Sequence, residues 1–257
     1  MTTLSERALQ FLRDGARPPL DICREVLGLP QANRAIADRL VTALLGSDPR
    51  FTTDLEGRWS VVPEPAWFGV PLDQVRFAVV DVETTGMRAR DRDRITEIAI
   101  VHVEGARVEP AFDSLVNPGI PIPWRIQQLT GITDDTVSGS PRFEEIADQV
   151  AAALAGRVFV AHHARFDWAF VSKELERALG WEPRMPRVCT VRLARRLVPE
   201  LARRNLDAVA FYFGLDNEAR HRAKGDAIVT AKALLRLVER ASEKGAVTMD
   251  ALVELGR

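Results

Sequence analysis

The sequence predicts an α/β protein in which helices flank a mixed β-sheet, preceded by a small domain of helices and a hairpin. From residue 77 onward, short apolar runs typical of buried strands alternate with helix-period segments. Two of these runs are separated only by a tight turn at Glu104 and Gly105, so the sheet combines antiparallel with parallel neighbours. The first 63 residues have a different order, in which helical segments precede two short β-prone runs.

The N-terminal segment, residues 1–63, is predicted to form a winged-helix-like domain. Three helix-period segments lead into two short runs around a turn at residues 54–57, which is the element order of that architecture. Eight arginines are balanced by eight acidic residues, so strong binding to a phosphate backbone is not expected and protein contact is at least as favoured. The apolar positions that indicate the helices are Leu4, Ala8, Leu9 and Leu12; Leu20, Val26 and Leu27; and Ile36, Leu40, Ala43 and Leu44.

A second domain follows a linker. Residues 63–73 contain three prolines and show no helix or strand period, so we predict a linker at residues 64–76, a domain at 77–243 and a short tail at 244–257. Within the domain, the predicted strands are residues 77–82, 95–103, 107–118 and 157–162. The predicted helices are residues 143–154, 166–179, 191–197, 206–213 and 223–240.

Composition excludes several classes of protein. The 257 residues carry a net charge of −1 with 46% hydrophobic residues, so the chain is neither a polycation nor a disordered polymer. Cys23 and Cys189 have no metal-type spacing, which suits a reducing compartment. The polar N-terminus lacks the pattern of a secretory signal, and the most apolar stretch, residues 150–161, is too short to span a membrane. We therefore expect a cytoplasmic protein with no membrane partner.

Acidic residues stand at the end of the first predicted strand of the larger domain. Residues two apart in a strand point to the same face, so Asp81 and Glu83 present both carboxylates together. Thr84, Thr85 and Gly86 then offer small side chains and backbone N–H groups where a substrate could approach closely. Read alone, the pair also fits a strand that ends at the protein surface.

Further acidic residues stand near other element ends. Asp167 lies where a helix is expected to begin, and Asp226 lies in the first turns of another helix, five residues after His221. Each has an ordinary structural explanation, such as an acidic residue that complements a helix dipole. Together, however, these side chains can converge on one edge of the sheet, where carboxylates would repel one another and require cations. Oxygen ligands favour Mg²⁺ or Mn²⁺ over Zn²⁺.

Three segments in this order resemble the exonuclease motifs of the DnaQ-like (DEDDh) superfamily of 3′→5′ exonucleases: VVDVETTG, AHHARFDWAF and HRAKGDAIVTA. The resemblance spans residues 77–240. The stretches IQQLTGIT, CTVRLARRLVP and LDAVAFYFGL are similar to the branch of the proofreading ε subunit of bacterial DNA polymerase III. The resemblance to the DnaQ-like superfamily implies an RNase H-like fold around a five-stranded mixed sheet.

The resemblance also implies roles for single residues. Asp81, Glu83, Asp167 and Asp226 would be ligands of two divalent cations, Mg²⁺ or Mn²⁺, and His221 would be the general base. One departure concerns the second motif, which usually reads His-Asn-Ala and here reads His162-His163-Ala164. The terminal nucleotide would be contacted by Thr84, Thr85, Gly86, Met87, Gln128, Thr130, His162, His163 and Phe166.

The resulting functional hypothesis is a metal-dependent 3′→5′ exonuclease that acts on single-stranded ends and releases nucleoside 5′-monophosphates, with DNA favoured over RNA. Residues 181–204 hold seven arginines against two glutamates, and this segment could follow a phosphate backbone. A DNA polymerase, or another replication or repair protein, would be a partner for proofreading or repair. The alternatives are an exoribonuclease of the RNase T or oligoribonuclease type and a DNA-binding protein without catalysis.

Overall fold

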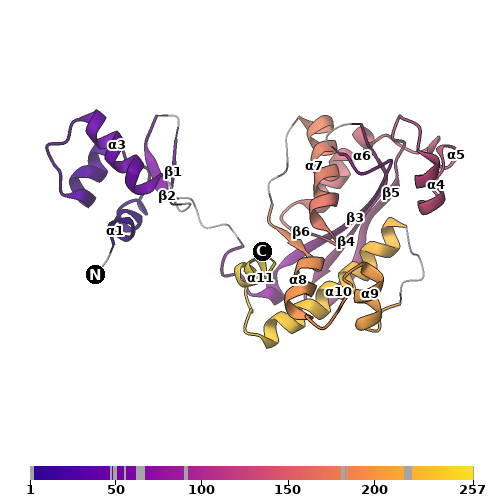
Figure 1. Cartoon of the computed structure of the whole chain (residues 1–257). Coiled ribbons are helices and arrows are strands. Elements are labelled where there is room, and N and C mark those ends of the chain that lie inside the picture. Colours follow the sequence, from indigo (N-terminus) through magenta and orange to yellow (C-terminus); the bar gives the residue numbers. More distant parts are fainter. Residues whose placement is uncertain are drawn as a thin grey trace. The chain divides into compact units, whose positions relative to one another are not determined.

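The computed structural model describes residues 3–46, 48, 51–54, 56–61, 67–89, 92–180, 183, 185–216 and 222–256. Contacts divide the chain into two compact units, Met1–Ala66 and Trp67–Arg257, each described by itself (Figure 1). In the described part of the chain, no helix combines the length and the apolar character needed to cross a bilayer.

The first unit contains helices followed by a two-stranded hairpin. Helix α1 (Leu4–Phe11), helix α2 (Pro19–Ile22) with its π-helical continuation (Cys23–Leu27), and helix α3 (Arg34–Leu45) precede β1 (Phe51–Thr53) and β2 (Trp59–Val61). Helix α3 forms as expected but buries another stripe: Ala37, Val41 and Leu45 are fully buried, while Ile36 is 49% exposed. The element order is the predicted one, and the winged-helix-like assignment remains a prediction.

The second unit is built on a five-stranded mixed sheet, as predicted, in the order β5-β4-β3-β6-β7. Strand β3 pairs antiparallel with β4 and parallel with β6, which in turn pairs parallel with β7. The strands are β3 (Arg76–Thr84), β4 (Ile95–Glu104), β5 (Arg107–Leu115), β6 (Val158–Ala161) and β7 (Arg187–Cys189). The helices are α4 (Trp124–Thr130), α5 (Asp134–Val137), α6 (Phe143–Leu154), α7 (Ala164–Leu179), α8 (Thr190–Leu197), α9 (Leu206–Tyr212), α10 (Ala223–Glu243) and α11 (Met249–Leu255).

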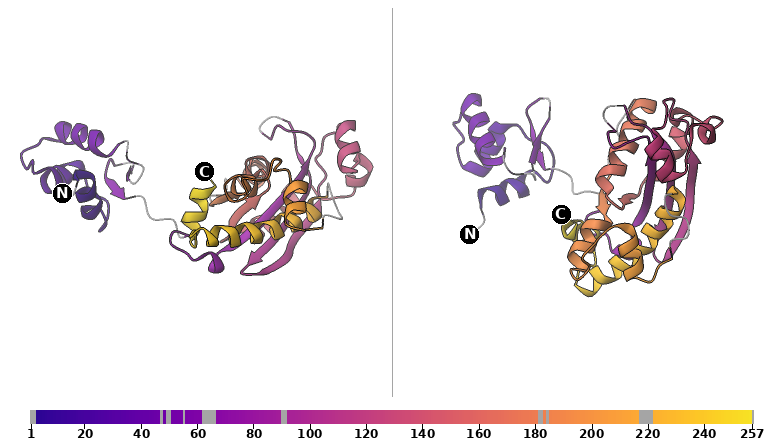
Figure 2. Two further views of the ribbon diagram at one scale, coloured as in Figure 1. Left: turned by 60° about the horizontal axis from the view of Figure 1, so that its bottom comes forward. Right: turned by 45° about the vertical axis from the view of Figure 1, so that its right-hand side comes forward.

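Two hydrophobic layers cover the sheet, and the alternation along β3 separates them. Phe77 and Val79 pack in the layer beneath α8–α11, whereas Val80 and Val82 pack in the layer beneath α6 and α7 (Figure 2). Because side chains alternate along a strand, the next positions on the α10 side are those of Asp81 and Glu83. The fold thus directs both carboxylates toward α10.

Residues 67–76 and 244–256, predicted as linker and tail, belong to the compact second unit. The Leu72 backbone N–H donates to the Val247 carbonyl at 3.0 Å, and Met249 and Leu252 are fully buried in the same core as Leu72. Their burial follows from the pairing of the two segments, which are about 180 residues apart in sequence and join only in the folded chain.

Candidate active site

Three carboxylates meet between β3 and α10. Ligand atoms of Asp81, Glu83 and Asp226 all lie within 4.8 Å of one another, close enough for one metal ion to touch all three. Asp226 reaches the cluster because α10 begins at Ala223 and places it in the first turn, where the positive end of the helix dipole favours an anion. Among the described residues, this is the one group of three carboxylate, histidine or cysteine side chains whose ligand atoms lie close enough together to hold a metal ion.

Asp167 adds a fourth carboxylate from α7. It is 3% exposed, and its charge is close enough to help raise the pKa of Asp81. Burial is the main cause that raises the pKa of Asp167 itself to about 8, opposed by backbone hydrogen bonds from Asp167 and Val82. Its Oδ2 is buried without a hydrogen-bond partner among the described residues. A buried acceptor left in this state is a position that a cation would satisfy.

The electrostatics of the cluster are unfavourable without a cation. Burial, followed by the charges of Asp167 and Asp226, raises the pKa of Asp81 well above its usual value. Burial and the charge of Asp226 raise the pKa of Glu83 to about 7, although Arg222 acts in the opposite direction. Each carboxylate penalises ionisation of its neighbours, so a divalent ion would relieve the repulsion. The donors are all carboxylate oxygens, and the residues therefore fit a hard divalent metal ion.

Glu97 was not predicted from the sequence, yet it links the cluster to α10. It lies opposite Glu83 in the β3–β4 pairing, next to a bulge that shifts the register between Glu83 and Thr84. Its Oε1 accepts from Arg222 Nη2 at 2.7 Å, and its Oε2 accepts from the Ala223 backbone N–H at 2.9 Å. The signal in the sequence is a charged residue within an apolar strand, which requires a partner when buried.

The histidines occupy different situations. His221 lies outside the described residues, so its role as general base stays a prediction from the motif. Both ring nitrogens of His162 have protein partners, the Thr190 hydroxyl and the Arg204 carbonyl, each at 2.9 Å. Burial lowers the pKa of His162 to about 4, so the ring is neutral. This geometry gives His162 a positioning part between β6 and the segment before α9, rather than a free atom for substrate.

The loop after β3 is held by its own polar groups. The Thr84 hydroxyl donates to the Gly86 carbonyl at 2.6 Å, and the Thr85 hydroxyl accepts from the Arg94 backbone N–H at 3.0 Å. A Cβ at Gly86 would lie 2.4 Å from an Asp93 oxygen, so a larger residue would displace the Asp93 carboxylate, which accepts the Arg88 backbone N–H at 2.7 Å. Thr84 and Thr85 therefore shape the loop, and their hydroxyls are already engaged.

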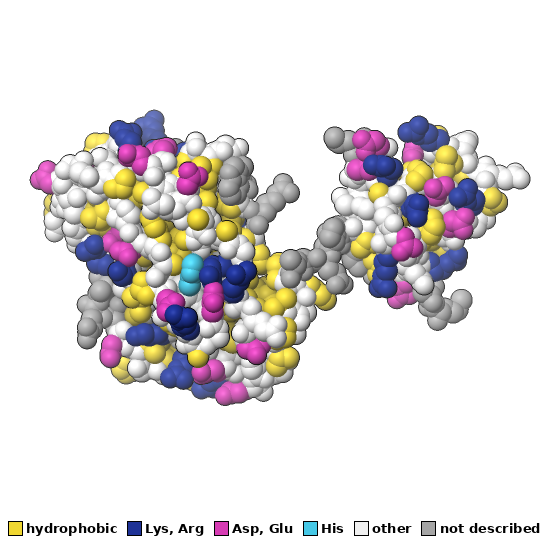
Figure 3. Space-filling model, turned by 180° about the vertical axis from the view of Figure 1, so that it is seen from behind, with side chains coloured by type: hydrophobic (Ala, Val, Ile, Leu, Met, Phe, Trp, Pro, Cys, Tyr) yellow, Lys and Arg dark blue, Asp and Glu magenta, His cyan; other side chains and the backbone are white. Residues whose placement is uncertain are grey.

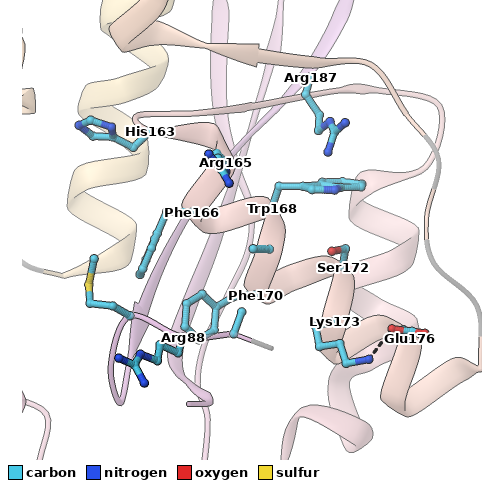
Figure 4. A pocket seen from close by; sticks show the side chains of 13 residues that line it. Arg88, His163, Arg165, Phe166, Trp168, Phe170, Ser172, Lys173, Glu176 and Arg187 are labelled. Carbon is cyan, nitrogen blue, oxygen red and sulfur yellow. Dashed lines mark hydrogen bonds and ion pairs between the residues drawn. The ribbon is translucent and has the colours of Figure 1, made fainter. Parts of the chain in front are cut away.

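Other predicted contact residues fall into two groups. Met87, which is 78% exposed, lines a groove of about 1180 Å³ together with His163 and Phe166 (Figure 4). On α4, Gln128 is exposed, whereas the buried Thr130 hydroxyl donates to the Ile126 carbonyl within its own helix. The structure thus brings Met87, His163 and Phe166 together and commits Thr130 to local structure.

The arginine-rich segment contributes mainly exposed side chains. Arg192, Arg195 and Arg196 lie on the exposed face of α8, and their contact with a nucleic acid stays a prediction. On the face seen in Figure 3, Lys and Arg side chains are interspersed with Asp and Glu. Neither sign of charge dominates that face, in agreement with the near-zero net charge.

Comparisons with known proteins agree with this fold and identify the family. The family model described as Exonuclease (RNase_T) covers residues 78–234. The chain is 34% identical over 163 residues to DNA polymerase III subunit epsilon of Aquifex aeolicus, covering 63% of this chain and 80% of that protein. It is 36% identical over 169 residues to 3′-5′ exonuclease DinG of Bacillus subtilis, covering 66% of this chain but 18% of the relative.

Among solved structures, Exonuclease X in complex with 5′ overhanging duplex DNA aligns with a TM-score of 0.55 and 26% identity. That alignment covers 72% of this chain and all of the other. The family match spans more than half of the chain and includes Asp81, Glu83, Asp167 and Asp226. The chain therefore belongs to the DnaQ-like family of 3′→5′ exonucleases.

Proposed function

We propose that this exonuclease removes nucleoside 5′-monophosphates from single-stranded DNA 3′ ends by metal-dependent hydrolysis. The observation that carries the proposal is the meeting of Asp81, Glu83 and Asp226 within 4.8 Å, beside the buried Asp167. Such a group of mutually repelling carboxylates is costly unless the site uses it.

The four carboxylates would hold two divalent ions, Mg²⁺ or Mn²⁺. When bound, the ions supply activation of a water and charge neutralisation at the scissile phosphate. The unpartnered Asp167 Oδ2 and the raised pKa values of Asp81 and Glu83 support this set of ligands. Glu97 contributes indirectly, because it holds the start of α10 and thereby the position of Asp226.

His221 would accept the proton of the attacking water. The water oxygen would form the new bond to phosphorus as the bond from phosphorus to the 3′ oxygen breaks. This releases a 5′-monophosphate, and the departing 3′ oxygen takes up a proton from solvent to become the new 3′-hydroxyl. A neutral imidazole is required for this role, so activity should rise with pH through the ordinary histidine range near about 6.5.

The terminal nucleotide would lie against the loop after β3. Met87 is exposed there and offers an apolar contact to a base, with Phe166 and His163 on the same side. Apolar and stacking contacts accept any base, which suits digestion without sequence preference. Gln128 on the exposed surface of α4 would add a polar contact.

The DNA preference and a place in proofreading or repair are supported by similarity to a DNA polymerase III subunit. Proofreading predicts that a mispaired 3′ nucleotide is removed faster than a paired one, because the terminus must leave the duplex before cleavage. The N-terminal unit, with its balanced charge, would contact a protein partner such as a polymerase.

The decisive experiment is a substrate panel of DNA and RNA 12-mers, single-stranded or with paired and mispaired 3′ ends. The variants are wild type, Asp81→Asn and the exposed control Asp148→Asn on α6. We expect wild type and the control to release 5′-mononucleotides from DNA 3′ ends with Mg²⁺ or Mn²⁺, and Asp81→Asn to lose activity by orders of magnitude. Faster digestion of RNA would replace the DNA assignment with the exoribonuclease alternative, and absence of all cleavage would overturn the proposal.

A further inference from the structure

A long groove follows the face of α7 that points away from Asp167. Its helical residues repeat at spacings of three and four, which places them on one side of the helix. His163, the loop after β3 and Arg187 of β7 form the rest of its lining (Figure 4). The helical residues are Arg165, Phe166, Trp168, Ala169, Phe170, Ser172, Lys173 and Glu176.

Two arginines give the groove uncompensated positive charge. Arg165 and Arg187 are exposed, and within the described residues no carboxylate forms an ion pair with either. Arg187 lies over the Trp168 ring at 5.0 Å, a contact that orients a guanidinium without neutralising it. Trp168 is itself fixed, 7% exposed with its ring edge-to-face against Phe159. The groove therefore presents at least one preorganised cation.

At the end of the groove farthest from the loop after β3, positive and negative charges balance. Lys173 donates to Glu176 at 2.7 Å, so this pair adds no net charge. At the near end, the exposed Met87, the exposed His163 and the half-buried Phe166 line the entrance. The first turn of α7 carries Asp167 of the carboxylate cluster, so the same helix supplies residues to both the cluster and the groove.

We propose that this groove binds the segment of a single-stranded nucleic acid that lies 5′ of the scissile bond, with Arg165 and Arg187 contacting its phosphates. The proposal rests on the exonuclease function and extends it to the nucleotides that are not cleaved. The stripe from Arg165 to Glu176 is about 16 Å long at 1.5 Å per residue, and at about 3.4 Å per stacked nucleotide it accommodates four or five nucleotides. A polyanion, rather than a small anion, matches two cations that come from separate elements, Arg165 of α7 and Arg187 of β7.

Binding is tested in the Asp81→Asn background with Mg²⁺, so that the strand is bound without being cleaved. Fluorescence anisotropy measures the affinity of labelled oligo-dT strands of two to twelve nucleotides across a salt series. The groove variant carries Arg165→Gln and Arg187→Gln, and each substitution is also measured alone. The matched control is Arg107→Gln at the start of the edge strand β5, where Arg107 pairs with Glu109. Thermal melting verifies that every variant is folded.

We expect the groove variant to bind the 12-mer about tenfold more weakly than the control, with the slope of log affinity against log salt reduced by about 1.4, or about 0.7 for each single variant. The gain in affinity with length, up to about six nucleotides, should be lost. Equal binding by the groove and control variants would overturn the proposal. The proposal would also be overturned if the groove variant lost as much affinity for the dinucleotide as for the 12-mer. The same holds if poly-glutamate displaced the 12-mer as effectively as unlabelled DNA does. Failure of wild type to cleave any strand would instead overturn the proposed function, because these binding readouts do not depend on cleavage.

Discussion

Glu97 accepts the backbone N–H of Ala223 at 2.9 Å, so a side chain on strand β4 caps the first residue of the helix that carries Asp226. The same carboxylate binds the Arg222 guanidinium through both of its oxygens. Because Glu97 stands opposite Glu83 in the sheet, one residue connects the strand and helix that supply the carboxylates.

Replacing Glu97 with alanine should reduce kcat without changing the metal ligands. The substitution frees Arg222 and the Ala223 N–H, so the start of α10 loses its anchor, and we expect a loss of about 10- to 100-fold, as for residues that orient metal ligands. Glu97→Gln keeps an acceptor for the Ala223 N–H and should recover part of kcat at saturating metal. Glu109→Ala on β5, an exposed position, is the control. A Glu97→Ala enzyme with normal kcat would show that the anchor is dispensable.

Because the carboxylates repel one another, removing one of them should make the metal-free protein more stable while it abolishes activity. Asp81→Asn removes a buried charge beside Asp167 and Asp226, so the metal-free variant should melt about 2–4 °C above wild type at pH 8. Magnesium should raise the Tm of wild type and have little effect on the variant. Differential scanning calorimetry measures both, and a lower Tm for the metal-free variant would contradict the repulsive arrangement.

The stability of the metal-free protein should depend on pH in a direction set by the raised pKa values. Glu83 and Asp167 have a pKa of about 7 and about 8 in the folded protein, above those of the unfolded chain. The contribution of these two groups to the free energy of unfolding is fully present below about pH 4 and is lost as pH rises toward about 8. Between these pH values the folded state holds more protons than the unfolded state. Urea denaturation at pH 5 and 8 in EDTA, compared with Glu83→Gln and Asp167→Asn, isolates the contribution of these two groups. Added Mg²⁺ should stabilise more at pH 8 than at pH 5.

His163 is held in a left-handed backbone conformation, with φ of 75° and ψ of 45°, alone among the described non-glycine residues. Asparagine, the usual residue of the family motif here, tolerates this conformation better than most residues. His163→Asn should therefore raise the free energy of unfolding by about 0.5–1 kcal/mol, whereas His163→Ala should not. Chemical denaturation of the three proteins decides this, and equal stabilities would remove backbone strain as an explanation.

Local patterns in the sequence were sufficient for the parts of the fold that depend on short-range periodicity. The short apolar run of β3 predicted a buried strand, in which residues two apart place Asp81 and Glu83 on one face, and the strand forms as predicted. Strand β7 was not predicted from the pattern, because its three residues are too few to show a period and it forms only by pairing with β6. Helix α11 was likewise assigned to a tail, since its burial depends on residues far away in sequence.

In the active site, too, some features follow from local sequence patterns and others only from contacts between distant segments. The carboxylates follow from motif residues at element ends, whereas Glu97 becomes visible as an anchor only when β4 and the start of α10 are adjacent. The face of α3 also escaped prediction, because apolar residues occupy two sides of that helix and only packing selects between them. Which residues hold the substrate depends on loop hydrogen bonds, such as those of Thr84 and Thr85, that a sequence pattern does not contain.

The most direct test of the metal cage is a titration with Mn²⁺ followed by electron paramagnetic resonance, in parallel with hydrolysis of a single-stranded DNA 3′ end. The account predicts two bound Mn²⁺ ions per chain, loss of both bound ions and hydrolysis in Asp81→Asn, and retention of both in Asp148→Asn. Hydrolysis of the 3′ end by a chain that binds no Mn²⁺ at its carboxylates would contradict it.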